Sequence, residues 1–192
     1  MKKKIAITLM ALGAVMVVLG ACLLGYNLYE SEQARISAES LMKTIRQQVE
    51  TVVPEQEDPF NDEMKIVNID GYGYVGYLSI PVLDLDLPVM ASCDLTRLKI
   101  SPCRYYGSTK TDNLVIAAHN YKYHFGYLGD LAAEDLISFT DMTGTVTNYR
   151  VKAVSVISPT ATDQVKDCGY DWVLYTCTYS GTKRIVVQCT YA

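Results

Sequence analysis

The sequence predicts a mainly β fold, closed or nearly closed into a barrel and preceded by an N-terminal transmembrane helix. The first 29 residues consist of a basic tip followed by 25 residues without a charged side chain. From residue 72 onward, short runs rich in Tyr, Val, Ile and Leu are broken by prolines and glycines. Many short strands with few helices are typical of small β-barrels.

Residues 5–29 form the predicted transmembrane helix. At ~1.5 Å per residue, this uncharged run is long enough to cross ~30 Å of hydrocarbon. Three lysines precede it, so the positive-inside rule keeps the N-terminus in the cytoplasm. Residues 1–29 are therefore interpreted as a cytoplasmic tip and a signal-anchor, with everything after Glu30 outside the cell membrane.

Two alternatives compete with an uncleaved anchor. A cleaved signal peptide usually has a shorter apolar region and a small-x-small cleavage site, and no such site is obvious here. A lipoprotein signal is the second alternative, because LGAC at 19–22 resembles a lipobox that ends in Cys22. All three interpretations place the remaining chain outside the cytoplasm.

Residues 30–71 are predicted to form an extracellular helix and a linker. Up to residue 50 the segment is polar, with a sparse apolar stripe that fits a surface helix leaving the membrane. The stripe consists of Ile36, Leu41, Ile45 and Val49. The next residues, TVVPEQEDPFNDEMKI, are acidic and carry two prolines, which is typical of a linker or loop.

Residues 72–192 are predicted to form one well-buried domain. Within this domain LDLDLPV alternates with period two, the pattern of a strand with one buried face. Further strands are expected at 113–118, 145–158, 172–178 and 184–191. A helical piece is expected over 125–139, where Leu128, Leu131, Leu136 and Phe139 can share a face.

The charge of the chain beyond residue 29 excludes some partners. This part has 14 basic and 21 acidic residues, a net charge of −7. An acidic surface argues against nucleic acid and against anionic lipid as partners.

The segment LYTCTYSGTKR, residues 174–184, contains the most informative cysteine. Two strands flank a loop with the composition of an ordinary hairpin connection. Residues flanking such a loop face each other at ~5 Å between Cα atoms, so Arg184 is predicted to lie opposite Cys177. The same register places Cys189 opposite residue 172, ~17 Å along the strand from Cys177. That distance is too long for a disulfide between Cys177 and Cys189.

Five cysteines lie beyond the predicted span, so at least one stays free or pairs between chains. Cys93 and Cys103 are ten residues apart and can close a short loop. Cys168 and Cys189 are a weaker candidate pair. Cys177 then remains as the odd thiol.

A nucleophilic Cys177 is the resulting hypothesis, because a nearby cation favours the thiolate. Arg184 can supply that charge, or it can stabilise an oxyanion during acyl transfer. Of the two histidines, His119 ends the apolar run LVIAAH where a loop opens, a common place for a catalytic group. A strand-end histidine without chemistry is the alternative. His124 is expected to be a surface or packing residue.

A metal site is not expected from these residues. The chain has no C-x-x-C motif. The spacings among its cysteines and histidines do not match those of structural zinc sites.

The chain resembles the sortases, membrane-anchored cysteine transpeptidases of Gram-positive bacteria. GYLSIPVLDLDLPV is similar to the first conserved strands of that family, and LVIAAHN to the segment with its catalytic histidine. VLYTCTYSGTKRIVV is similar to the cysteine strand, its loop and the catalytic arginine. The resemblance runs from about Gly76 to the C-terminus. It implies an eight-stranded sortase-type β-barrel with short helices, occupying residues 72–192.

The resemblance implies Cys177 as nucleophile, His119 as general acid/base, and Arg184 as stabiliser of the oxyanion or substrate. The implied reaction cleaves an LPXTG-like sorting signal of a surface protein or pilin through a Cys177 thioester. The amine of a cell-wall precursor or a pilin lysine then resolves the thioester. Calcium serves some members, but no compelling acidic cluster is seen here, so no cofactor is expected.

The sortase class stays open. An N-terminal anchor without a C-terminal membrane helix is closer to the class B and class D layout. Asp58-Pro59-Phe60 resembles the lid of pilin-type sortases, or is simply a turn in the linker. Two other functions also stay open: a cysteine peptidase that hydrolyses the same acyl-enzyme, and a non-catalytic membrane-anchored β-domain that binds surface ligands.

Overall fold

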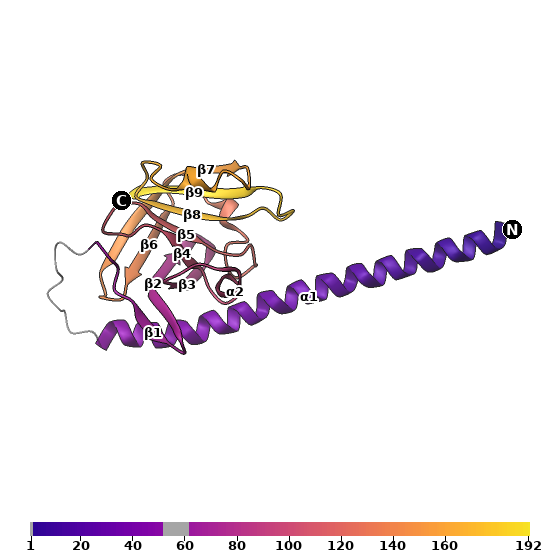
Figure 1. Cartoon of the computed structure of the whole chain (residues 1–192), viewed down its shortest axis with the longest axis horizontal. Coiled ribbons are helices and arrows are strands. Elements are labelled where there is room, and N and C mark those ends of the chain that lie inside the picture. The colour runs from indigo at the N-terminus through magenta and orange to yellow at the C-terminus, as the bar shows by residue number, and fades with distance from the viewer. Residues whose placement is uncertain (1, 52–61) are drawn as a thin grey trace.

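The computed structural model describes residues 2–51 and 62–192, and Asp58-Pro59-Phe60 lies outside the described residues. A single long helix, α1 (Lys2–Thr51), runs along one side of a β-barrel, and its N-terminal half projects beyond the barrel (Figure 1). The predicted span and the predicted surface helix are therefore one continuous helix. By length and composition α1 is able to cross a membrane, and its most apolar stretch is not buried by the rest of the chain.

The C-terminal half of α1 is docked on the barrel instead of lying free at the surface. Its buried positions recur at helical spacing and include two small residues that allow close approach. They are Ala34, Ala38, Met42 and Ile45. Of the predicted stripe, Ile45 is buried and Leu41 and Val49 pack against the same hydrophobic cluster, whereas Ile36 is exposed. Ion pairs tie α1 to the barrel near both ends of the docked half, Glu30 with Lys99 and Arg46 with Asp86.

Among the described residues, eight strands close the barrel, which confirms the predicted architecture. They are β2 (Tyr72–Ile80), β3 (Leu85–Met90), β4 (Cys103–Tyr106), β5 (Leu114–Ala117), β6 (Leu136–Asp141), β7 (Val146–Ile157), β8 (Trp172–Cys177) and β9 (Arg184–Tyr191). The order is β2-β3-β4-β5-β8-β9-β7-β6, and pairing of β6 with β2 closes the ring. The β3–β4 and β5–β8 pairs are parallel, and the other pairs are antiparallel.

Short elements complete the fold. The strand β1 (Val67–Ile69) adds to the outer edge of β2, and the helix α2 (Leu95–Leu98) lies between β3 and β4. Three single 3-10 turns span Pro81–Leu83, Leu128–Asp130 and Thr162–Val165.

The predicted helix over 125–139 is wrong. Only Leu128–Asp130 forms a helical turn, and β6 begins at Leu136. Two glycines, Gly126 and Gly129, weaken helix formation in this segment. Ile137 and Phe139 are buried with period two, because β6 pairs with β2 on one side and β7 on the other. Tertiary pairing therefore overrides the helical spacing of the leucines.

Side chains alternate between the barrel interior and an outer face, and this alternation decides where site residues point. On β8, Trp172 and Leu174 belong to the interior core, while Val173 and Tyr175 belong to an outer cluster. On β5, Leu114 and Ile116 point inward and Val115 packs in the same outer cluster. The outer surface of β5 and β8 is therefore one continuous face.

Barrel closure depends on a glycine in β2. Gly76 has φ +148°, and a Cβ at this position would lie 2.1 Å from the carbonyl oxygen of Thr140 on β6. The strand is also bulged between Tyr74 and Gly76 in its pairing with β3. The backbones of β2 and β6 approach each other closely here because no side chain stands between them.

Gly76→Ala is expected to destabilise the barrel by at least ~3 kcal/mol, because the new methyl group must push β6 away from β2. Gly71→Ala is the matched control: Gly71 also has positive φ, +83°, but no atom lies within 4 Å of the place its methyl group would take. The control should cost only ~1 kcal/mol. Denaturant unfolding of the two detergent-solubilised variants measures the difference, and equal losses would contradict the closure argument.

His124 was expected to be either a surface residue or a packing residue, and in the structure it is a packing residue. Its side chain is fully buried, and burial lowers the pKa of His124 to about 4. The unfolded chain takes up this proton near pH ~6.5, whereas the folded chain does so only near pH 4. The contribution to stability is therefore complete above pH ~6.5 and is lost as the pH falls toward 4.

When the pH falls from 7 to 5, the free energy of unfolding is expected to decrease by about 2 kcal/mol, because His124 becomes protonated in the unfolded chain but not in the folded chain. The His124→Phe variant should lack that part of the pH dependence, because its side chain has no proton to bind. The two proteins are compared by denaturant unfolding at both pH values, and His119 is present in each. Parallel pH dependences in the two proteins would refute the assignment.

Candidate active site

The β8–β9 hairpin has the register that the sequence predicts. Cys177 faces Arg184 at the open end, and Trp172 faces Cys189 at the other end. Backbone hydrogen bonds close the loop, from Thr178 N to the carbonyl of Lys183 (3.0 Å) and from Gly181 N to the carbonyl of Thr178 (2.8 Å). The half-buried thiol and the guanidinium group therefore originate from directly opposed positions of two paired strands.

The guanidinium of Arg184 is held by its own loop. Its Nη1 donates to the carbonyl oxygens of Gly181 and Lys183, both at 3.1 Å. Tyr175 lies on the same outer face as Cys177, two residues earlier. Burial raises the pKa of Tyr175, and the positive charge of Arg184 opposes that effect, so the guanidinium and the phenol interact electrostatically. The cation thus lies near the outer face where the thiol points.

His119 lies at the same end of the barrel as Cys177. In the parallel β5–β8 pair, Ala117 faces Tyr175; His119 lies two residues beyond the end of β5, and Cys177 lies two residues further along β8. The alignment continues past the strand ends, because Ala118 N donates to the carbonyl of Tyr175 (3.2 Å). Since side chains alternate, His119 and Cys177 share the outer face.

Two side chains lock the His119 segment to the cysteine strand. The hydroxyl of Thr176 donates to the carbonyl of Ala118 at 2.8 Å, and the amide of Asn120 donates to the carbonyl of Thr178 at 3.2 Å. These bonds flank His119 and Cys177 in sequence. They fix the relative position of the two backbones without using either reactive side chain.

The His119 imidazole is half-buried against an aromatic ring. The centroid of the Tyr121 ring lies 4.9 Å from that of His119, at an interplanar angle of 31°. Burial lowers the pKa of His119, while Glu30 raises it and Lys99 lowers it further. The net direction is downward, so His119 is neutral at pH 7 in the free protein and is able to accept a proton.

The cysteine arrangement agrees in part with the sequence. All six cysteines are present as thiols. Cys93 and Cys103 pack in the same hydrophobic cluster, and their proximity raises the pKa of Cys103 and lowers that of Cys93, so this predicted pair is close together. Cys168 and Cys189 lie in different hydrophobic clusters, the outer one and the interior one. The structure does not bring this second pair together.

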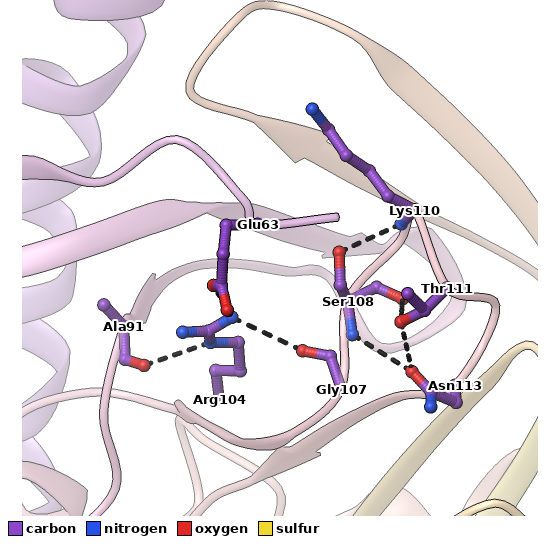
Figure 2. Close-up of polar contacts among 8 residues, drawn as sticks. All are labelled: Glu63, Ala91, Arg104, Gly107, Ser108, Lys110, Thr111 and Asn113. Atoms are coloured by element: carbon purple, nitrogen blue, oxygen red, sulfur yellow. Dashed lines mark hydrogen bonds and ion pairs between the residues drawn. The ribbon is translucent and has the colours of Figure 1, made fainter. Parts of the chain in front are cut away.

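A hollow of about 560 Å³ lies beside the outer face. Tyr105 lines it and packs edge-on against Tyr175, with ring centroids 5.3 Å apart. Arg104 also lines the hollow. The Nε of Arg104 donates to the carbonyl of Ala91 (3.1 Å), and its Nη1 lies 3.5 Å from the Glu63 carboxylate (Figure 2). The hollow therefore approaches the Cys177 strand through the Tyr105–Tyr175 contact.

Within residues 2–51 and 62–192, no group of three or more His, Cys, Asp or Glu side chains is arranged to hold a metal ion. The chemistry available at this end of the barrel is that of a thiol, a neutral imidazole and a guanidinium. Such a set is suited to nucleophilic acyl transfer.

Sequence reasoning missed three residues around the site: Glu30, Tyr121 and Tyr175. Tyr175 could have been found, because period-two alternation places it on the face of Cys177. Tyr121 and Glu30 could not, since their contact joins positions 91 residues apart. Only docking of α1 on the barrel brings them together.

Comparison with known proteins identifies structures with the same fold. Three solved structures share the fold: sortase C1 from Streptococcus agalactiae, sortase C-3 from Streptococcus pneumoniae and sortase A from Corynebacterium diphtheriae. The first is 25% identical, with a TM-score of 0.55 over 65% of this chain and 70% of its own. The second is 21% identical, with a TM-score of 0.58 over 87% and 84%. The third is 21% identical, with a TM-score of 0.57 over 87% and 92%.

A search of curated protein sequences found no match. The sequence model of the sortase domain matches residues 78–192, more than half of the chain and the whole hairpin that carries Cys177 and Arg184. The chain therefore belongs to the sortase family of cysteine transpeptidases.

Proposed function

We propose that this sortase cleaves an LPXTG-like sorting signal with Cys177 as nucleophile, His119 as general acid/base and Arg184 as stabiliser of the oxyanion. The observation that carries the proposal is that two strand pairings converge at one end of the barrel. The β5–β8 pairing aligns His119 with Cys177, and the β8–β9 pairing sets Arg184 opposite Cys177.

In the proposed reaction, His119 takes the proton of the Cys177 thiol, and the sulfur attacks the carbonyl carbon of the Thr in the signal. The oxyanion that forms is stabilised by Arg184, whose guanidinium exchanges a loop carbonyl for the substrate oxygen. Protonated His119 gives its proton to the leaving amine as the C–N bond breaks, which leaves a thioester. An incoming amine attacks the thioester and gives a proton to His119, which returns it to the departing Cys177 sulfur.

The proposed location is the outer surface of the cell membrane. Residues 1–29 are then the cytoplasmic tip and single transmembrane anchor, residues 30–71 an extracellular helix and linker, and residues 72–192 the catalytic barrel. The β8–β9 loop and α2 lie at the end of the barrel toward which the free half of α1 extends (Figure 1). This arrangement supports a site that faces the membrane boundary.

The proposed partners are a donor and an acceptor. The donor is a surface protein or pilin with a C-terminal sorting signal, and the acceptor is the amine of a cell-wall precursor or of a pilin lysine. One fold neighbour, sortase C of Streptococcus pneumoniae, is described by its pilin substrate specificity. The acidic chain beyond residue 29 supports a cationic or neutral acceptor over nucleic acid.

Cys177→Ala is expected to abolish formation of the acyl-enzyme, because Cys177 is the proposed nucleophile and alanine has no thiol. Mass spectrometry of the full-length protein in detergent, incubated with a panel of LPXTG-like peptides, measures the thioester adduct. Cys168→Ala is the matched control and should acylate normally. Retained turnover in Cys177→Ala would end the proposal.

Arg184→Ala is expected to lower kcat/KM by about 10²–10³-fold, the usual cost of removing one oxyanion stabiliser. Arg184→Lys keeps the charge but loses the planar fork, so it should recover only part of the rate. Steady-state peptide cleavage measures both. Wild-type rates in Arg184→Ala would remove Arg184 from the mechanism.

Addition of triglycine is expected to divert the product from the free acid to the amide. A transpeptidase resolves its thioester with an amine, whereas a cysteine peptidase with the same residues uses water. Product analysis by mass spectrometry distinguishes the two. Acid as the only product at high triglycine concentration would favour the peptidase, and an unreactive Cys177 would favour a non-catalytic binding domain.

A further inference from the structure

The imidazole of His119 packs against the ring of Tyr121, and Tyr121 is hydrogen-bonded to a residue of the anchor helix. The ring of Tyr121 contacts both histidines, with its centroid 4.9 Å from that of His119 and 5.6 Å from that of His124. The hydroxyl of Tyr121 donates to Glu30 Oε2 at 3.0 Å. Glu30 is the first charged residue after the uncharged run of α1.

Glu30 is built into this end of the barrel instead of pointing into solvent. Its second oxygen, Oε1, accepts from the hydroxyl of Tyr26 at 2.8 Å and lies 3.2 Å from Lys99 Nζ. Three segments therefore converge on one carboxylate: α1, the residue after α2, and the loop that follows β5. Each oxygen has a partner, so the carboxylate has a fixed direction toward Tyr121.

The Tyr121 hydroxyl is suited to be the donor in this contact. Burial and the bond to Glu30 raise the pKa of Tyr121 to about 12, so the phenol keeps its proton at neutral pH. The Tyr121 backbone is also fixed, because its carbonyl accepts from His124 N at 3.0 Å and from Gly126 N at 2.9 Å. With both ends held, the ring has one position against His119.

We propose that Tyr121 is a positioning residue for His119, and that Glu30 of the anchor helix holds Tyr121 in place. The juxtamembrane helix is then part of the active site and not only a tether. The role of His119 in this inference rests on the proposed function, whereas the contact between Tyr121 and His119 is independent of that function.

The kinetic test uses the full-length protein in detergent micelles, with an LPXTG-like peptide as acyl donor and triglycine as acceptor. Tyr121→Phe keeps the ring and loses the bond to Glu30, and Glu30→Ala loses the same bond from the other side. Each is expected to lower kcat by about tenfold with KM within twofold, because a loosely held acid/base spends less time in reactive geometry. The double variant should be no slower than either single variant.

Rescue and control variants separate positioning from other effects. Glu30→Gln keeps an acceptor oxygen and should recover most of the rate. Glu32→Ala removes an acidic charge two residues away on α1, where its partner is Arg35. Arg46→Ala breaks the ion pair between α1 and Asp86 of the barrel. Both controls should keep kcat within twofold of wild type.

An equal loss of kcat in Arg46→Ala and Glu30→Ala would mean that helix docking alone matters, and would overturn the proposal.

A second readout needs no turnover. The chain has only two histidines, so ¹³C-histidine labelling gives two sets of ring signals, assigned with His119→Asn. The His119 signals are expected to shift or broaden in Tyr121→Phe and Glu30→Ala and to stay in place in both controls. Unchanged signals would overturn the contact. Shifted signals with unchanged kcat would overturn the positioning role, whereas an active His119→Asn would instead refute the proposed function.

Discussion

The parallel register of β5 and β8 is the constraint on which the candidate site depends. Ala117 faces Tyr175, and the next two residues on each strand carry the imidazole and the thiol to the same face. A slip of one residue would turn one of the two side chains into the barrel interior. The antiparallel β8–β9 register adds the guanidinium independently. The placement of His119, Cys177 and Arg184 at one end of the barrel is therefore a property of backbone ladders, which are set by many hydrogen bonds, and not of one side-chain contact.

The rest of the barrel keeps these registers fixed. Trp172 begins β8 in the interior, where it packs against Phe139 of β6 and Tyr149 of β7. A shift of β8 would have to move this indole out of a close-packed core, at a cost of several kcal/mol. Closure through the β2–β6 pairing prevents β6 from moving away to make room. The core thus fixes one end of β8, and Cys177, the proposed nucleophile, occupies the other end of the same strand.

The sequence predicted those features that depend on local patterns and missed those that depend on docking. Alternation, turn composition and strand length were sufficient for the β8–β9 hairpin and for the position of Arg184 opposite Cys177. The helix expected over 125–139 failed because the leucine spacing fits a helix, while β6 is selected by its two neighbouring strands. No local sequence pattern indicated Glu30 or Tyr121, because their contact depends on the docking of α1 along the barrel.

The protonation state of the site gives Arg184 a specific task. Burial lowers the pKa of His119, so the imidazole is neutral in the free protein and becomes charged only when it takes the Cys177 proton in the proposed reaction. A guanidinium is always charged, and in this structure the carbonyls of Gly181 and Lys183 solvate it. A hydrogen bond from a guanidinium to an oxyanion joins two charged groups, whereas its bonds to the loop carbonyls have a charged donor only. In the proposed mechanism the bond from Arg184 therefore strengthens as the substrate oxygen gains charge, which is the condition for stabilising a transition state more than the bound substrate.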